Sequence, residues 1–269
     1  MCSQTFKKMA CFNKVFKQIA IALLLLPIAL NLVSCSRIPL GTVTQDGVYE
    51  YRSLHSPDGI GKFYRGREIA KVMGHSELLW LERSDRQRQE RPDRAIEALN
   101  LQPDDIVADI GAGIGYFSFR IAKQVPEGLV YAVDVQPEML DVLRFLKSEN
   151  GVENVKPILG TATHPNLPEA SIDVALMVDA YHEFEWPREM MERVVKSIAP
   201  DGRVVLLEYR GENPLIPIKR LHKMTQKQVK REMAAVGLQW RETFDGLPNQ
   251  HLMVFSRPNA VANPNFVKE

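Results

Sequence analysis

A glycine-rich segment after an apolar run carries the clearest chemical signal in the chain. Residues 109–115 read DIGAGIG and lead into a helical pattern. Glycines let the backbone adopt positive φ and approach a bound group closely, and the following helix presents free N–H groups. In an α/β sheet such a loop lies at the carboxyl ends of the strands, where ligands bind. The segment therefore predicts a cradle for a ligand.

Asp134 ends the next apolar run, 19 residues beyond Gly115. A carboxylate at this place can accept hydrogen bonds from both hydroxyls of a ribose. The ordinary alternatives are a plain strand-to-helix turn for the glycines and a helix N-cap for the aspartate. The two features in this order favour a nucleoside-containing ligand. A dinucleotide is disfavoured because Tyr116 stands where its fingerprint needs a glycine, and a P-loop because its lysine is missing.

A third polar segment, residues 179–184 with the sequence DAYHEF, follows a later apolar run. His182 is the only side chain in it whose unperturbed pKa lies near neutrality, so it is a candidate general base. The face of Tyr181 is suited to stabilise a cation at close range. A buried histidine that caps the turn before Trp186 is an equally good interpretation of His182.

The spacing of possible ligands predicts no metal site. Asp179, His182 and Glu183 offer three ligands, but no further pair has ligand spacing. The other histidines considered, His164, His222 and His251, are scattered along the chain, and none is assigned a role. All three cysteines lie in the first 35 residues. The rest of the chain therefore has neither a thiolate site nor a cysteine nucleophile.

The elements that must position these residues alternate between strand and helix. Apolar runs predict strands at residues 106–110, 129–133, 155–159, 172–178 and 204–207, and amphipathic patterns predict helices at 116–125, 137–148, 188–198 and 225–236. Two last strands, 239–244 and 251–256, flank a turn-rich connection. This rhythm predicts an α/β fold: a Rossmann-like, doubly wound, mostly parallel seven-stranded sheet with a C-terminal antiparallel hairpin.

The order of these motifs resembles that of the class I S-adenosylmethionine-dependent methyltransferases, over about residues 101–256. The resemblance implies S-adenosylmethionine as the cofactor. It places Gly111, Gly113 and Gly115 along the methionine part of the cofactor, Asp109 in support of that loop and the ammonium, Asp134 on the ribose, and Val135 beside the adenine. Residues 179–184 would face the sulfonium and the acceptor, with Asp179 binding the cofactor and His182 and Tyr181 as catalytic residues.

One segment departs from the family pattern. Many members place an acid after the third strand, where it meets the adenine amino group, whereas residues 160–162 here read GTA. The hydroxyl of Thr161 or a backbone carbonyl would accept that hydrogen bond instead. Thr161 and Ala162 are therefore assigned to the cofactor site.

The N-terminal segment, residues 1–34, resembles a bacterial lipoprotein signal peptide. Residues 1–18 carry lysines, and the apolar run 19–33 would span about 22 Å as a helix, short of the ~30 Å hydrocarbon core. The sequence LVSC at 32–35 resembles a lipobox, in which the cysteine, Cys35, is lipidated. An uncleaved signal anchor is the alternative. Either would tether the body to a membrane on its far, extracytoplasmic side.

Between this segment and the sheet we expect a tether and a helical cap. Glycines and prolines punctuate residues 35–63, and the apolar spacing of 64–100 predicts an N-terminal helical cap whose first part, 64–83, is a candidate substrate lid. Trp80 either packs this segment or contacts substrate. The balanced charges of residues 82–97 are typical of a solvated helix surface. The cofactor-binding domain then covers residues 101–258, with 259–269 as a tail.

Composition limits the possible partners. The chain has 34 basic and 33 acidic residues, but four lysines lie in the first 34 residues, which contain no acid. The slightly acidic remainder offers no broad surface for nucleic acid. A group of basic residues could favour an anionic acceptor or simply be solvated: Arg210, Lys219, Arg220 and Lys223.

Together these features predict a membrane-tethered methyltransferase that acts on a small-molecule acceptor. The alternative is a catalytically silent binding module with the same fold, because an exported domain would lie outside the cytoplasm, where S-adenosylmethionine is made. A nicotinamide oxidoreductase is disfavoured by the glycine spacing. The oligomeric state stays open.

Overall fold

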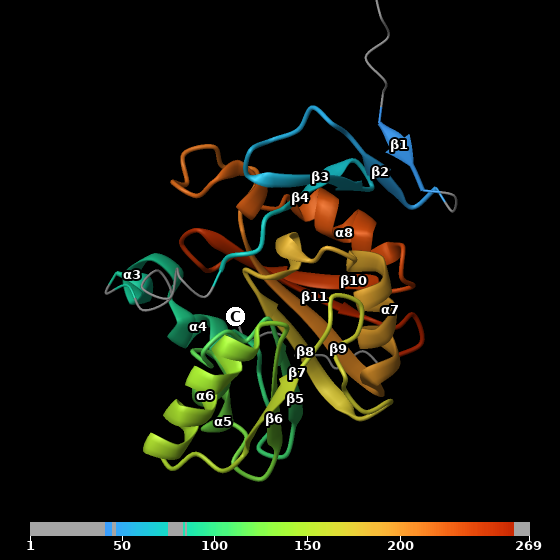
Figure 1. The fold of residues 1–269 in the computed structure, drawn as a ribbon. Helices are drawn as coiled ribbons and strands as arrows, with labels where there is room; N and C mark the ends of the chain where they lie inside the picture. The colour runs from blue at the N-terminus through green and yellow to red at the C-terminus, as the bar shows by residue number, and fades with distance from the viewer. Residues whose placement is uncertain (1–40, 45–46, 75–82, 84, 261–269) are drawn as a thin grey trace, which may run out of the picture. The chain divides into compact units, whose positions relative to one another are not determined.

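A seven-stranded sheet forms the centre of the protein (Figure 1). The computed structural model describes residues 41–44, 47–74, 83 and 85–260. The strands follow the order β10-β11-β9-β8-β5-β6-β7. Their bounds are β5 Ile106–Ile110, β6 Leu129–Asp134, β7 Val155–Leu159, β8 Ile172–Val178, β9 Ile198–Tyr209, β10 Gln239–Phe244 and β11 Gln250–Ser256. Strand β11 pairs antiparallel with both β9 and β10, and the other pairs are parallel. The predicted mostly parallel sheet with a terminal hairpin is confirmed.

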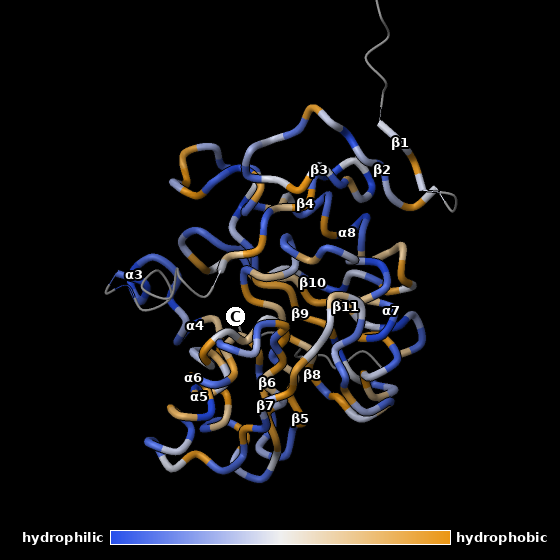
Figure 2. Tube along the Cα trace, in the orientation of Figure 1, coloured by the Kyte–Doolittle hydropathy of each residue, from blue (hydrophilic) through white to orange (hydrophobic). Residues whose placement is uncertain are grey.

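Helices cover both faces of this sheet because its strands are apolar on both sides. The helices are α3 Arg86–Glu90, α4 Pro92–Ala98, α5 Ser118–Ala122, α6 Pro137–Glu149, α7 Pro187–Ser197 and α8 Gln226–Ala234. Proline at the first position starts α4, α6 and α7, where its missing N–H costs no helical hydrogen bond. In Figure 2 the strands of the sheet are mainly orange, whereas α3 is mainly blue.

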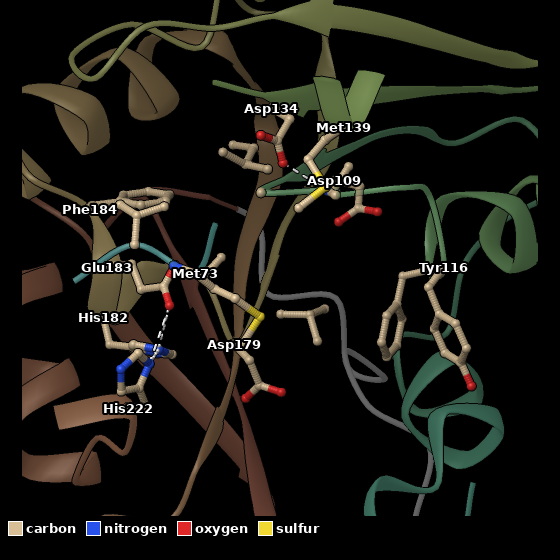
Figure 3. A pocket seen from close by; sticks show the side chains of 18 of the residues that line it. Met73, Asp109, Tyr116, Asp134, Met139, Asp179, His182, Glu183, Phe184 and His222 are labelled. Atoms are coloured by element: carbon tan, nitrogen blue, oxygen red, sulfur yellow. Dashed lines mark hydrogen bonds and ion pairs between the residues drawn. The ribbon is translucent and has the colours of Figure 1, made fainter. Parts of the chain in front are cut away.

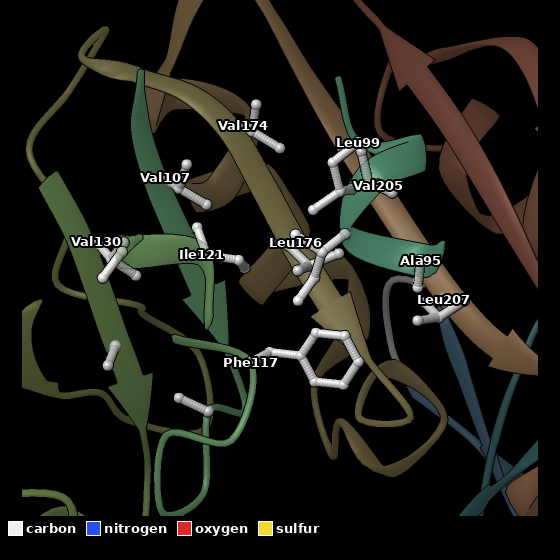
Figure 4. Packing of buried hydrophobic residues seen from close by; sticks show 14 of the residues in the cluster. Ala95, Leu99, Val107, Phe117, Ile121, Val130, Val174, Leu176, Val205 and Leu207 are labelled. Atoms are coloured by element: carbon white, nitrogen blue, oxygen red, sulfur yellow. The ribbon is translucent and has the colours of Figure 1, made fainter. Parts of the chain in front are cut away.

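Two apolar cores result. On one face, Ile121 of α5 and Leu143 of α6 pack with Val107 and Leu176 of the sheet (Figure 4 shows part of this core). On the other, helices α7 and α8 pack on the strand residues that point the opposite way, such as Ala108. Alternate residues of each strand thus serve different cores, as a two-sided sheet requires.

The N-terminal part of the described chain is a second, smaller sheet, which corrects the sequence expectation. Strands β1 Thr42–Val43, β2 Tyr49–Tyr51, β3 Gly59–Tyr64 and β4 Arg67–Ala70 form an antiparallel sheet in that order, where a tether and then a helix were expected. Strands β3 and β4 are joined by Arg65 and Gly66, both at positive φ (46° and 82°). Such two-residue turns match the twist of a hairpin.

Arg67 connects the small sheet to the large one. Its Nε and one terminal nitrogen donate to the two carboxylate oxygens of Glu232 in α8, at 2.7 and 2.9 Å, and its other terminal nitrogen donates to the carbonyl of His182 at 3.0 Å. Both charged side chains are almost completely buried. The ion pair therefore fixes β4 beside the segment that follows β8.

Several sequence expectations fall outside the described residues: the signal peptide, Cys35, Trp80 and most of the C-terminal tail. Within the part of the chain that the structure describes, no helix combines the length and apolar character needed to cross a membrane.

Candidate active site

A cavity of about 740 Å³ opens at the carboxyl ends of β5, β6 and β8 (Figure 3). This is where the strand order reverses, because the chain passes from β5 outward to β7 and then returns to β8 on the other side of β5. Ligands of doubly wound sheets bind at this point. Eight of the residues assigned from sequence line the cavity: Asp109, Gly111, Gly113, Asp134, Val135, Ala162, Asp179 and His182.

The glycine loop is shaped by positive φ angles. Gly111, Gly113 and Gly115 have φ values of 82°, 56° and 88°. A Cβ atom on Gly111 would lie 2.5 Å from the Cβ of Ala180, so the loop after β5 touches the loop after β8. Gly115 does not line the cavity: its missing Cβ makes room for Phe119 and Leu143. The third glycine therefore serves helix packing rather than ligand contact.

Asp134 lies at the end of β6, directly beside the glycine loop, because Ile110 pairs with Val133 in the parallel register. Its two carboxylate oxygens accept backbone N–H groups, Oδ2 from Gly113 and Oδ1 from Gln136, both at 2.9 Å. Burial raises the pKa of Asp134, and these hydrogen bonds oppose the rise. Each oxygen has a further lone pair, so the carboxylate retains capacity for a ribose diol.

Asp109, near the end of β5 and just before the glycine loop, binds the helix that follows the loop. Its Oδ2 accepts a hydrogen bond from the hydroxyl of Ser118, the first residue of α5, at 2.6 Å. Burial raises the pKa of Asp109 to about 6, against the opposing effect of the Ser118 hydrogen bond. This hydrogen bond joins the end of β5 to the start of α5, on either side of the glycine loop.

Asp179 presents a buried acceptor to the cavity. Its Oδ2 accepts from the side-chain amide of Gln250 at 2.7 Å, whereas Oδ1 is buried with no hydrogen-bond partner among the described residues. Burial, together with the charges of Glu90 and Glu208, raises the pKa of Asp179 well above its usual range. A cationic group bound in the cavity would satisfy this oxygen and favour its ionised form.

His182 is held on both ring nitrogens. Its Nδ1 lies 2.7 Å from Oε2 of Glu208 in β9, and its Nε2 lies 3.1 Å from Nδ1 of His222 and 3.7 Å from Oε1 of Glu183. Burial lowers the pKa of His182, but Glu208 and Glu183 outweigh it and raise the pKa to about 10. An imidazole whose two nitrogens are both engaged by neighbouring side chains is not arranged as a general base. The role of general base that the sequence suggested for His182 stays a prediction, and the geometry of its ring nitrogens argues against it.

Two other assigned residues point away from the cavity. Tyr181 is fully buried, and its hydroxyl donates to Glu232 at 2.8 Å, so it belongs to the Arg67 ion pair rather than to the cavity wall. Phe184 lines the cavity instead. Thr161 is exposed, and its hydroxyl takes part in hydrogen bonds within its own loop. Of the two residues assigned to the cofactor site in this loop, Thr161 and Ala162, it is Ala162 that lines the cavity.

The short helix α3 is a cavity wall, not the solvated surface that its charges suggested. Glu90 is only 2% exposed and lines the cavity. It accepts from Arg86 at 2.8 Å, from the hydroxyl of Tyr209 at 2.8 Å, and from Arg83. The guanidinium of Arg86 lies 4.0 Å above the ring of Tyr116. Nothing in a balanced run of charges distinguishes these buried residues from their exposed neighbours.

His222 and Glu208 were also not assigned from the sequence. His222 comes from η3 (Arg220–His222), 40 residues after His182 in η2 (Tyr181–Glu183). Glu208 lies inside an otherwise apolar strand run and is completely buried. In the sequence, the only signal for Glu208 was an acid within an apolar run. Its partner, His182, could not be foreseen, because the pairing of β8 with β9 brings the two together.

Comparison with known proteins agrees with this architecture. The sequence profile of a family described as "Methyltransferase domain" matches residues 101–251, more than half of the chain, and the chain belongs to this family. It is 31% identical over 141 residues to an uncharacterized methyltransferase-like protein of Schizosaccharomyces pombe, covering 52% of each chain. It is 32% identical over 122 residues to an uncharacterized methyltransferase of Bacillus subtilis, covering 45% of this chain and 47% of the relative. The chain thus spans about half the length of these curated relatives.

A solved structure shares the fold. A SAM-dependent methyltransferase from Aquifex aeolicus superposes with a TM-score of 0.65 at 19% identity, covering 68% of this chain and 98% of the other. The chain therefore contains a methyltransferase domain, and it shares the fold of an enzyme that depends on S-adenosylmethionine. The residues present fit that cofactor: a strongly curved glycine loop, a carboxylate at the end of β6 and an unsatisfied buried acceptor at Asp179 face one cavity.

Proposed function

We propose that this protein transfers the methyl group of S-adenosylmethionine to a small, largely apolar acceptor bound in the same cavity. The observation that carries the proposal is that one cavity is lined both by the glycine loop and Asp134 and by a wall of imidazole and carboxylate groups (Figure 3). Asp134 would bind the ribose, the backbone of Gly111 and Gly113 the methionine part, and Asp179 the amino group. The cofactor supplies a methyl group activated by a positively charged sulfur.

The chain's own contribution is alignment and exclusion of water. Methyl transfer is an in-line displacement, so it depends mainly on holding two reactants in contact at the correct angle. Apolar side chains supply much of the wall, among them Val72, Met73, Ile114, Phe117, Met139, Phe184, Met190 and Ile218. Such a wall favours an acceptor with apolar surface and a single nucleophilic heteroatom.

The nucleophilic group of the acceptor would lie against the polar wall. Burial acts to raise the pKa of Glu183, but its hydrogen bonds with His182 and His222 lower the pKa to about 2, which makes Glu183 a weak base. His182 is engaged at both nitrogens. His222 lines the cavity and is the remaining imidazole of this wall, so we assign it the acceptor end of the site.

The basic residues give little support to an anionic acceptor. Lys219 lines the cavity but forms an ion pair with Asp58 at 2.8 Å, and Arg210 pairs with Asp245. The ammonium of Lys223 donates to backbone carbonyls. We therefore propose an uncharged acceptor.

Isothermal titration calorimetry with S-adenosylmethionine, S-adenosylhomocysteine and NAD tests the proposal. We expect both adenosyl ligands to bind and NAD not to bind. Release of S-adenosylhomocysteine in the presence of a panel of apolar phenols, thiols and amines then identifies the acceptor class. Binding without turnover on any acceptor would favour the catalytically silent module, and absence of binding at millimolar ligand would reject the methyltransferase assignment of this site.

A further inference from the structure

Three possible metal ligands converge on one point of the cavity wall. The Nε2 atom of His182, the Nδ1 atom of His222 and the Oε1 atom of Glu183 all lie within 4.8 Å of one another. Their separations are 3.1 Å between the two nitrogens, 3.3 Å from His222 to Glu183 and 3.7 Å from His182 to Glu183. Figure 3 shows the three side chains gathered at one side of the cavity.

These separations match a tetrahedral coordination shell. Zinc binds imidazole nitrogen and carboxylate oxygen at about 2.0–2.2 Å, so neighbouring ligand atoms in a tetrahedron lie about 3.3–3.5 Å apart. The distance from His222 to Glu183 falls within this range, and the other two lie about 0.2 Å below and above it. Two histidines and one glutamate are also a ligand set of catalytic zinc sites, which keep the fourth position open.

The surrounding residues orient each ligand. Glu208 accepts from the Nδ1 side of His182 at 2.7 Å, which leaves Nε2 directed at the other two ligands. The backbone N–H of Met73 donates to Oε2 of Glu183 at 3.1 Å and leaves Oε1 directed inward. Carboxylate–histidine partners of this kind fix the tautomer and orientation of metal-bound histidines. The carboxylates of Glu183 and Glu208 would balance the charge of a divalent cation.

We propose that His182, Glu183 and His222 bind a divalent cation of the zinc type, with its fourth coordination position open to the cavity. This position suits the hydroxyl or thiol of the acceptor, whose proton would leave to water when the group binds the cation, while the oxygen or sulfur keeps a lone pair for attack on the methyl group. The role toward the acceptor rests on the proposed methyl transfer, whereas cation binding itself does not.

Metal binding can be measured directly on the full chain. The protein is stripped with a chelator and titrated with Zn²⁺ by calorimetry, and Co²⁺ is used as a spectroscopic probe of tetrahedral geometry. We expect the wild type to bind one equivalent of Zn²⁺ and both His222→Ala and Glu183→Gln to lose it. Glutamine keeps the shape of the Glu183 side chain. Glu208→Gln should weaken binding by ~10- to 100-fold, the usual cost of losing an outer partner. His164→Ala changes a histidine that lies outside the cavity wall and is the matched control.

Calorimetry with S-adenosylhomocysteine on the same variants separates the two proposals. Retained cofactor binding in His222→Ala shows that the fold and the cofactor site are intact. If the His222→Ala and Glu183→Gln variants bind Zn²⁺ as the wild type does, or if the stripped wild type takes up no equivalent, the cluster is a hydrogen-bonded network only and the metal site is rejected. Failure of S-adenosylhomocysteine to bind the wild type would reject the cofactor site without affecting the metal result.

Discussion

The carboxylate of Asp134 accepts a hydrogen bond from the backbone N–H of Gly113 at 2.9 Å. The residue expected to bind the ribose is therefore also the residue that holds the glycine loop in place. The two parts of the cofactor site, which come from the ends of β5 and β6, are thus coupled before any ligand binds. Losing this carboxylate should affect both.

Replacing Asp134 should weaken both adenosyl ligands alike. Hydrogen bonds to a charged group contribute about 1.5–3 kcal/mol each, so Asp134→Ala should raise the Kd of S-adenosylmethionine and S-adenosylhomocysteine by ~10- to 1,000-fold. Calorimetry measures both constants, and circular dichroism checks the fold. Asp141→Ala removes an exposed carboxylate from α6 and serves as the control. Unchanged affinity in Asp134→Ala would show that Asp134 does not bind the ribose.

Gly111→Ala should destabilise the protein through two separable effects. Gly111 has φ of 82°, and an added Cβ would meet Ala180 at 2.5 Å; Gly237 has φ of 81° with nothing within 4 Å. Gly237→Ala should therefore cost only the backbone strain, about 1–2 kcal/mol. Gly111→Ala should cost about 1–3 kcal/mol more from overpacking. Chemical denaturation measures both, and equal losses would show that the loops after β5 and β8 separate easily.

Cofactor binding should tighten as the pH rises through about 6. Burial raises the pKa of Asp109 to about 6, with Asp134 and Arg86 as the charged groups that act on it. Its ionised form attracts a cationic ligand, so affinity should be lower at pH 5 than at pH 7. Ser118→Ala removes the hydrogen bond that lowers this pKa, and its midpoint should move to higher pH. If the midpoint does not move in Ser118→Ala, a group other than Asp109 controls the titration.

The buried ion pair between Arg67 and Glu232 should matter more than an exposed pair of the same chemistry. Arg67→Met leaves the Glu232 carboxylate buried without its cation, a loss that typically costs about 3–5 kcal/mol. The Arg188–Glu192 pair is exposed, so Arg188→Met should cost less than about 1 kcal/mol. Chemical denaturation of the two variants measures the loss in free energy of unfolding that each causes. A loss in Arg67→Met no larger than in Arg188→Met would show that water reaches Glu232.

The lipid anchor at Cys35 stays a prediction from the sequence. Wild-type protein expressed in a bacterium should partition into detergent and incorporate labelled fatty acid, and Cys35→Ser should do neither. Cys11→Ser is the matched control, because Cys11 lies in the lysine-bearing segment before the apolar run. Wild-type protein that stays in the aqueous phase without label would reject lipidation.

The sequence by itself determined the large sheet and the position of the glycine loop. Strands such as β5 and β8 are mostly apolar, with one aspartate each, and their type follows from the local pattern. The glycine loop and Asp134 were also recognisable, because the loop follows β5 directly, Asp134 ends β6, and the parallel sheet places these strand ends at one edge. These features depend on neighbours in the chain, which a sequence displays.

The tertiary structure alone decided which side chains meet. Glu90 became buried because α3 covers the cavity, and Tyr181 turned to Glu232 because Arg67 of the small sheet binds there. His222 reached His182 through a short helix 40 residues further on. Contacts of this kind depend on how separate elements pack, and no local periodicity or spacing records that. The polar wall around His182 and His222 could therefore be built only from the folded chain.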